Sequence, residues 1–254
     1  MTRTVVVTGS ASGIGKATAA LLAETGVRVI GVDLRDADVM VDLGTAAGRQ
    51  ALVGGVRAIA GEAIDAVFAC AGISTSEPPT VSVNYFGVLA TLEGLRPLLA
   101  RGSQPRAVTI ASIASIFPDV DQDLVEACIR GDEEGALDVA RGKGSAFYSS
   151  SKAALARWVR RTAIRPEWAG TGILLNAVAP GVIETPMARS MIDDAAAMAH
   201  LQRIIPMQIG RYGQPEEVAQ LLRFLGSPEN SYMVGQVIFI DGGGEATNRG
   251  DKIW

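Results

Sequence analysis

A glycine-rich turn between two apolar segments restricts the possible folds of this chain more than any other feature. The run TVVVT at Thr4–Thr8 leads into TGSASGIG at Thr8–Gly15, and the helical pattern GKATAALLAE overlaps the end of that turn. The β-branched run predicts a buried strand, and the longer alanine- and leucine-rich run predicts a helix. Strand, tight turn and helix in this order form the first half of a βαβ unit, which predicts a parallel sheet.

Short apolar runs keep alternating with longer helical patterns along the 254 residues. This predicts one α/β domain over residues 1–254, a Rossmann-like, doubly wound parallel sheet of seven strands with helices on both faces. The expected strands are Thr4–Thr8, Val27–Val32, Val39–Val41, Ala66–Ala69, Ala107–Ile110, Ile173–Ala177 and Gln236–Ile240. The expected helices are Gly13–Thr25, Thr45–Ile59, Val81–Ala100, Ser149–Ala163 and Pro215–Leu225.

The composition favours small-molecule chemistry. A formal net charge of −4 offers no basic surface for nucleic acid or anionic lipid, so neither partner is expected. No apolar run reaches the length of a membrane span and no secretory signal precedes the first strand, so we expect a cytoplasmic protein. Two cysteines, Cys70 and Cys128, and one histidine, His200, cannot form a typical zinc site; we expect no metal and two unpaired thiols.

The glycine-rich turn has the properties of a pyrophosphate site. Glycines let the backbone approach phosphates closely, and the N–H groups at the start of a helix favour anions. Asp33 ends the second strand, where a carboxylate accepts hydrogen bonds from the adenosine ribose and repels a 2′-phosphate, or else merely closes a turn. We therefore expect NAD rather than NADP. The residues expected to bind it are Gly9, Ser12, Gly13, Ile14, Gly15, Asp33 and Leu34, with Asp42 and Leu43 at the end of the third strand beside adenine.

Tyr148 and Lys152 stand four positions apart in GSAFYSSSKAALARW, so on a helix both side chains share one face. One interpretation is a solvated helix surface. The other is a catalytic pair in which the ammonium stabilises a phenolate, which an isolated phenol with a pKa of about 10 does not form at neutral pH. The spacing alone leaves both open. Serine–histidine–aspartate hydrolysis is disfavoured, because the chain has a single histidine.

The glycine-rich turn and six further motifs follow the order found in the short-chain dehydrogenase/reductase family, and nearly the whole chain resembles that family. The turn is similar to its T-G-x-x-x-G-I-G, and CAG stands where the family has N-A-G. VNYFG, IAS, YSSSK, NAVAPGVIET and GQVIFIDGG also resemble family segments. Within the family, GVDLRDADVMVDLGTAAGR and VSVNYFG resemble the bacterial NAD-dependent 3α-hydroxysteroid dehydrogenase/carbonyl reductases.

The resemblance implies a catalytic set. Tyr148 exchanges a proton with the substrate oxygen, Ser112 holds that oxygen, and Lys152 stabilises the phenolate and binds the nicotinamide ribose. Asn84 supports a water-linked proton path, and Thr185 orients the carboxamide. Structural alternatives are a strand-end turn for Ser112, a helix-interior polar group for Asn84 and a helix cap for Thr185. The further cofactor-binding residues implied are Cys70, Ala71, Gly72, Pro180, Gly181, Val182, Ile183 and Thr185.

Three segments depart from the family pattern or adapt it. Cys70 replaces an asparagine, which leaves open how the central strands are held together, although a cysteine packs well in a buried position. The residues 118–143 lengthen the distance between Ser112 and Tyr148 and carry two helical patterns. Three roles are open for these residues: they cap the active site, they replace part of the helix interface that the resemblance implies for tetramers, or they form a solvent-exposed surface segment, a solvated excursion. Residues 186–210 are the expected substrate loop, rich in Met, Ile and Leu, and are either a lid or an amphipathic helix packed on the body.

These features predict an NAD-dependent dehydrogenase/carbonyl reductase that interconverts a secondary alcohol and a ketone on a bulky apolar molecule, alicyclic, steroid-like or aryl. Two rivals are a dehydratase or epimerase that uses the same tyrosine, and a dinucleotide-sensing binding protein without catalysis. We expect a homodimer or homotetramer with a non-standard interface. One candidate interface is the face that carries the last strand and the tail, where a partner would bury Trp254.

Overall fold

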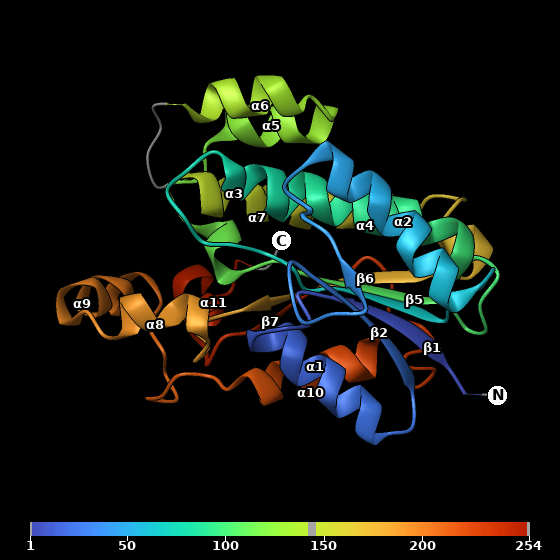
Figure 1. Ribbon diagram of the computed structural model, residues 1–254. Helices are drawn as coiled ribbons and strands as arrows, with labels where there is room; N and C mark the ends of the chain where they lie inside the picture. Colours follow the sequence, from blue (N-terminus) through green and yellow to red (C-terminus); the bar gives the residue numbers. More distant parts are fainter. Residues whose placement is uncertain (1, 142–145, 253–254) are drawn as a thin grey trace.

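Seven parallel strands form one sheet in the order β3-β2-β1-β4-β5-β6-β7 (Figure 1). The computed structural model describes residues 2–141 and 146–252. The strand order reverses direction between β1 and β4, which is the switch point of a doubly wound sheet. The predicted fold class is therefore confirmed. The strands are β1 (Thr4–Thr8), β2 (Arg28–Asp33), β3 (Val39–Met40), β4 (Ala66–Ala69), β5 (Arg106–Ile110), β6 (Leu174–Pro180) and β7 (Val237–Ile240).

Helices cover both faces of the sheet, and each face has its own buried cluster (Figure 1). On one face lie α1 (Gly13–Glu24) and α10 (Pro215–Leu225). On the other lie α2 (Ala46–Ala60), α4 (Val88–Leu99) and α7 (Ala146–Thr162). None of the described helices is long and apolar enough to cross a bilayer.

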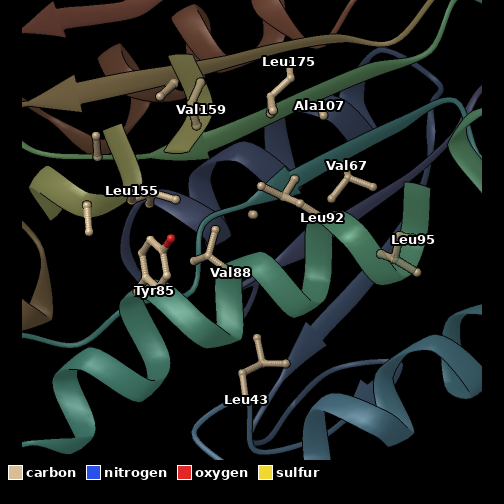
Figure 2. Packing of buried hydrophobic residues seen from close by; sticks show 14 of the residues in the cluster. Leu43, Val67, Tyr85, Val88, Leu92, Leu95, Ala107, Leu155, Val159 and Leu175 are labelled. Carbon is tan, nitrogen blue, oxygen red and sulfur yellow. The ribbon is translucent and has the colours of Figure 1, made fainter. Parts of the chain in front are cut away.

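The larger core cluster shows why the second layer is helical. Val88, Leu92 and Leu95 recur at helical spacing, so they form one buried stripe on α4 that faces Val67 of β4 and Ala107 of β5 (Figure 2). From α7, Leu155 and Val159 enter the same cluster. This packing holds α7, and with it the Tyr148–Lys152 pair, against the sheet.

The helix predicted at Val81–Ala100 forms, but it is not uniform. It begins as α3 (Pro79–Val81), passes through the π-helical stretch η1 (Ser82–Gly87) and continues as α4. A π-helical insertion widens one turn, which a periodicity of 3.6 residues does not reveal. The wider turn contains Asn84.

Other boundaries differ from those expected. β6 continues to Pro180 because its last residues pair with β7, as Val178 with Ile238 and Pro180 with Ile240. α7 starts at Ala146, so Tyr148 lies in its first turn rather than before it. β3 ends at Met40, and Asp42 and Leu43 lie in the turn before α2 rather than at the strand end.

The segment at 118–143 forms two helices, α5 (Gln122–Arg130) and α6 (Glu133–Ala140), as its two periodic patterns predicted. Leu124, Val125 and Ala136 are fully buried and belong to the main core cluster. The described part of this segment is therefore not a solvated excursion; Lys143 lies outside the described residues. Figure 1 shows α5 and α6 stacked over α7 and α3.

The segment at 186–210 forms α8 (Pro186–Ile192) and α9 (Ala195–Ile204), which project at one end of the sheet (Figure 1). Met191, Leu201 and Ile205 of this segment pack on the body and also line the cavity described below. Its role as a lid stays a prediction. The structure also has η2 (Ile113–Ile116), η3 (Ala169–Thr171) and α11 (Gly244–Arg249), which were not predicted. Trp254 and the side chain of His200 lie outside the described residues.

Candidate active site

A cavity of about 790 Å³ opens at the carboxyl ends of the central strands. This is where ligands bind in open parallel sheets, because the strand order reverses there and leaves a crevice. Asn84 is the predicted site residue that does not line it. All the others do: Gly9, Ser12, Gly13, Ile14, Gly15, Asp33, Leu34, Asp42, Leu43, Cys70, Ala71, Gly72, Ser112, Tyr148, Lys152, Pro180, Gly181, Val182, Ile183 and Thr185.

The glycine turn meets the demands of a phosphate site. Gly9 and Gly13 adopt positive φ angles of 71° and 52°, and a Cβ at Gly9 would lie 2.9 Å from the backbone nitrogen of Ala71. Ser12 is the N-cap of α1 but makes no side-chain capping bond. The first turn of α1 therefore presents N–H groups to the cavity, as a pyrophosphate requires.

Asp33 stands at the end of β2 with its carboxylate at the cavity. Its Oδ2 accepts a hydrogen bond from the backbone nitrogen of Ala11 at 3.0 Å, and its Oδ1 accepts one from Leu34 at 2.7 Å. It thus closes a turn and lines the cavity at once. Arg35 also lines the cavity beside it.

Asp42 has a different immediate role from the one expected. Its Oδ1 accepts a hydrogen bond from the backbone nitrogen of Gly44 at 2.8 Å, so the carboxylate stabilises its own turn. The side chain nevertheless lines the cavity together with Leu43. Contact with adenine stays a prediction for both residues.

The structure brings Ser112, Tyr148 and Lys152 together from β5 and α7. The Lys152 Nζ lies 5.7 Å from the centre of the Tyr148 ring and donates a hydrogen bond to the carbonyl oxygen of Ile110 at 2.8 Å. Ser112 follows β5, and its Oγ accepts a hydrogen bond from the backbone nitrogen of Ala114 at 3.1 Å. Because that oxygen accepts there, its hydroxyl proton stays available to another oxygen.

Burial shifts the ionisation of this group. It raises the pKa of Tyr148 above its ordinary value of 10.0, and a hydrogen bond with Ser112 opposes that shift. Burial lowers the pKa of Lys152 to about 8, against a small opposing effect of the nearby Cys70 sulfur. Burial also raises the pKa of Cys70 to about 12, so this thiol is neutral at physiological pH.

Asn84 lies behind the cavity and is fully buried in η1. Its Oδ1 accepts a hydrogen bond from the backbone nitrogen of Ile73 at 2.8 Å, and its Nδ2 donates one to the carbonyl oxygen of Ile73 at 2.9 Å and another to Ser151 Oγ at 3.3 Å. The side chain therefore fixes the segment after β4 to α7. A role in proton transfer stays a prediction.

Two threonine side chains hold the central strands together beside Cys70, the position at which the family pattern has an asparagine. Thr8 Oγ1 accepts a hydrogen bond from the backbone nitrogen of Ala71 at 3.1 Å, and Thr109 Oγ1 donates one to the carbonyl oxygen of Ala69 at 3.1 Å. These bonds join β1, β4 and β5 at their carboxyl ends. Cys70 is only partly buried and faces the cavity, which differs from the buried position expected.

The segment after β6 closes the other side of the cavity. A Cβ at Gly181 would lie 2.8 Å from the Cα of Asp241, so only glycine lets β6 and the end of β7 approach this closely. Thr185 caps α8, accepting a hydrogen bond on Oγ1 from the backbone nitrogen of Ala188 at 3.3 Å. The cap that we considered as an alternative for Thr185 therefore forms, and the same residue lines the cavity.

Sequence reasoning missed the apolar wall that follows Ser112. Ile113, Ala114 and Phe117 turn back into the cavity through η2, opposite Met191 and Leu201 of the 186–210 segment. The pattern "IASIASIF" contains no periodicity that distinguishes a cavity wall from a core turn. Further lining residues that were not predicted are Ala11, Val32, Val41, Ile73, Ser74, Val83, Ile110, Ala111, Pro186 and Ala188.

Known proteins similar to this chain match it over nearly its full length. A family model described as short chain dehydrogenase matches residues 3–122, and one described as Enoyl-(Acyl carrier protein) reductase matches residues 135–245. The 3-alpha-hydroxysteroid dehydrogenase/carbonyl reductase of Comamonas testosteroni is 36% identical over 253 residues, covering 96% of this chain and 97% of that protein.

Solved structures share the fold over nearly the full length. The 3-alpha-hydroxysteroid dehydrogenase from Pseudomonas sp. B-0831, complexed with NADH, is 40% identical with a TM-score of 0.91, covering 98% of this chain and 99% of that one. The Pseudomonas aeruginosa RhlG/NADP active-site complex is 28% identical with a TM-score of 0.76, covering 96% of each chain. The order of motifs, the strand order and these full-length likenesses agree: the chain belongs to the short-chain dehydrogenase/reductase family of oxidoreductases.

Proposed function

We propose that the protein is an NAD(H)-dependent dehydrogenase/carbonyl reductase that interconverts a secondary alcohol and a ketone on a bulky apolar substrate. One observation carries this proposal. The cavity that begins at the glycine turn continues without interruption to Tyr148, Lys152 and Ser112. A dinucleotide whose pyrophosphate lies on α1 therefore reaches the phenol with its other end.

The residues fit a dinucleotide cofactor. A Cβ at Gly9 would clash with the backbone of Ala71, and one at Gly15 with the carbonyl oxygen of Gly9, so glycine lets this turn close tightly at the cavity. Thr185 lies next to the turn, with its Cγ2 3.3 Å from where a Cβ of Gly13 would lie. A bound nicotinamide would supply the hydride acceptor for oxidation of the carbinol carbon and the hydride donor for reduction of the carbonyl carbon. In this proposal the side chains of the chain handle only the proton and the position of the substrate oxygen.

Tyr148 is the general acid and base. In the oxidation direction its phenolate takes the proton of the substrate hydroxyl, and in the reduction direction its phenol returns that proton to the developing alkoxide. Burial opposes the phenolate. The buried Lys152 ammonium, 5.7 Å from the ring centre, counteracts this cost by its charge.

Ser112 holds the substrate oxygen against Tyr148. Its Oγ accepts a hydrogen bond from the backbone nitrogen of Ala114, which leaves the hydroxyl proton free to be donated to the substrate oxygen. A second donor aimed at the same oxygen stabilises the charge that develops on it. Lys152 donates a hydrogen bond to the carbonyl of Ile110. We propose that it also binds the nicotinamide ribose.

The preference for NAD over NADP rests on Asp33. Two of the carboxylate's lone pairs accept backbone hydrogen bonds, and a carboxylate has about four such sites, so it can still accept from ribose hydroxyls. The same negative charge repels a 2′-phosphate. NADH in the Pseudomonas sp. B-0831 structure supports this choice, whereas the more distant RhlG complex holds NADP.

An apolar part of the cavity wall supports the proposed substrate class. Phe117, Met191, Leu201 and Ile205 are apolar, and methionines adapt to irregular apolar shapes. A flat alicyclic or aryl ketone buries area on such a wall without needing polar partners. The names of the Comamonas testosteroni and Pseudomonas sp. B-0831 enzymes support a hydroxysteroid or carbonyl substrate.

The test is turnover by wild type and Tyr148→Phe, followed through NADH absorbance with a panel of alicyclic and aryl ketones and alcohols. We expect kcat to fall by at least about a thousandfold in Y148F, while the Kd for NADH changes by less than about twofold, because only the proton donor is removed. Comparable turnover by Y148F would reject the acid/base role. Tight NADH binding without turnover of any compound by wild type would favour the dinucleotide-sensing alternative, and loss of water from a hydroxylated substrate would favour a dehydratase.

A further inference from the structure

The last described helix, α11, is fixed to the sheet rather than loosely attached. Asp241 follows β7, and its carboxylate accepts hydrogen bonds from the backbone nitrogens of Gly243 at 3.1 Å and Glu245 at 2.6 Å. At the other end of the helix, the Arg249 guanidinium lies 6.0 Å from the centre of the Phe239 ring of β7. The position of α11 is therefore set by β7.

The first turn of α11 lies directly behind the cavity wall. Gly244 is buried, and a Cβ at this position would lie 2.8 Å from Ile113 Cδ1 and 3.0 Å from Ile205 Cγ2. Both isoleucines line the cavity, one from η2 next to Ser112 and one from the end of the 186–210 segment. The absence of a side chain at Gly244 lets these two side chains recede from the cavity.

The rest of α11 holds the end of the same segment. Asn248 Nδ2 donates a hydrogen bond to the carbonyl oxygen of Ile204 at 2.7 Å, and Gln208 Nε2 donates one to Thr247 Oγ1 at 3.2 Å. Ile204 immediately precedes Ile205, so the bond from Asn248 fixes the backbone that carries a wall residue. Figure 1 shows α11 beside the chain that descends from α9.

We infer that α11 is the support of the substrate wall, with Gly244 setting the depth of the cavity and Asn248 positioning the segment that closes it. This inference rests on the proposed function and adds two residues that determine which substrate sizes are accepted. Neither residue lines the cavity. They act through Ile113 and Ile205, so their substitution changes the fit of large substrates and leaves the chemistry unchanged.

The first test compares Gly244→Ala with wild type on two ketones that differ by one ring, 2-decalone and cyclohexanone. The added methyl presses on the flexible ends of two isoleucine side chains, which yield toward the cavity. We expect the ratio of kcat/KM for 2-decalone over cyclohexanone to fall by about tenfold, with the KM for NADH unchanged. The matched control is Gly54→Ala in α2, where a Cβ meets nothing within 4 Å. An unchanged ratio in G244A, or an equal fall in G54A, overturns the inference.

The second test removes the bond to the segment. Asn248→Ala and Asn248→Asp both lack the amide donor, so we expect the KM for 2-decalone to rise about threefold while kcat with cyclohexanone stays unchanged. Asn248→Gln retains the amide on a longer arm and should restore part of the loss. A fall in kcat for both ketones, or no difference between N248A and N248Q, contradicts the positioning role.

Failure of the proposed function is distinguishable from failure of this inference. If wild type reduces neither ketone, the proposed function fails. The inference is then tested by the rise in Tm that 2-decalone causes in the NADH-loaded protein. We expect that rise to be smaller in G244A than in wild type and G54A. Equal rises in the three proteins overturn it.

Discussion

At the scale of single residues, the candidate site combines Tyr148, which as the proposed base needs a nearby positive charge, with Lys152, whose charged form burial destabilises. Lys152 is 3% exposed, and burial lowers its pKa to about 8. At neutral pH most molecules still carry the ammonium, whose proton is shared with the carbonyl oxygen of Ile110. Burying this ammonium costs folding free energy, and the function that we propose for Lys152 explains why the charge is kept at this position.

This cost predicts a pH dependence of stability. The pKa of Lys152 is about 8 in the folded state against 10.5 as its ordinary value. The unfolded chain thus binds more protons between these pH values, and the folded state is penalised most below pH 8. Relative to Lys152→Met, the free energy of unfolding of wild type should rise by about 2 kcal/mol between pH 7.5 and pH 9.5, which is part of the roughly 3 kcal/mol that the full pKa difference is worth. Urea unfolding of both proteins at each pH measures the difference; a flat or falling difference contradicts the lowered pKa.

The proposed preference for NAD also rests on one residue, Asp33. Replacing Asp33 by Asn removes the charge and keeps the shape, so the kcat/KM preference for NAD over NADP should narrow by about tenfold. Asp36→Asn is the matched control, because Asp36 has a φ of 51° that asparagine also adopts and does not line the cavity. Steady-state kinetics with both cofactors decide. A wild-type preference for NADPH, or an equal effect of D36N, would refute the assignment to Asp33.

At the scale of elements, the α5–α6 segment is part of the main core rather than a lid. No residue from α5 or α6 lines the cavity. Arg49 of α2 donates two hydrogen bonds to the carboxylate of Glu133, at 3.1 and 2.7 Å, and the backbone nitrogen of Asp121 donates one to Ser150 Oγ of α7 at 2.9 Å. The segment is therefore tied to two helices. Of the three roles considered for it, capping the active site and solvated excursion do not fit the described residues.

The hydrogen bond that the backbone nitrogen of Asp121 donates to Ser150 Oγ lies just before the first residue of α5. This bond fixes the start of α5 on α7, next to the helix turn that carries Tyr148. The segment therefore contributes to stability near the site without forming its wall.

Truncation of a buried side chain in this segment tests that view. Leu124 of α5 is fully buried, so Leu124→Ala should lower the free energy of unfolding by about 3 kcal/mol. Ile164→Ala is the control, because Ile164 is 70% exposed and its truncation should cost less than about 1 kcal/mol. Urea unfolding measures both. Equal losses would place α5 outside the cooperative core, whereas unchanged turnover by L124A at low temperature would confirm that the segment is no lid.

At the scale of the whole molecule, α5 and α6 determine which faces stay available for assembly. They stack over α7 and α3 (Figure 1). The family resemblance implies a helix-on-helix interface that includes α7. A second copy of the chain cannot occupy the same place without displacing a segment that contributes to the core. We therefore keep the expectation of a closed assembly built on another face.

We expect light scattering to show a homodimer or a homotetramer. In the structure of that assembly, we expect α4 and α7 of one copy not to contact α4 and α7 of another. The physical reason is steric, since α5–α6 cover α7. Cryo-electron microscopy of the assembly locates the contacts. An assembly that retains the α4/α7 interface, with α5–α6 directed wholly into solvent, would overturn this prediction.

The sequence by itself determined the individual strands and helices of the βαβ units and the glycine turn. It also determined that Tyr148 and Lys152 share one helix face. These depend on interactions within a few residues: β-branched runs, helical periodicity and glycine conformations. The site residues that end strands were predictable for the same reason, because the carboxyl ends of parallel strands meet at one edge. Two separated helical patterns likewise predicted α5 and α6.

Only the tertiary structure decided what depends on distant packing. The π-helical turn at Asn84, the wall formed by Ile113 and Phe117, and the threonine bonds that hold the strands beside Cys70 each involve partners far apart in the chain. The short helix α11 is the clearest case. Six residues are too few to form a stable helix by propensity, so its position is set by Asp241, Phe239 and the segment it supports, and no local pattern encodes those contacts.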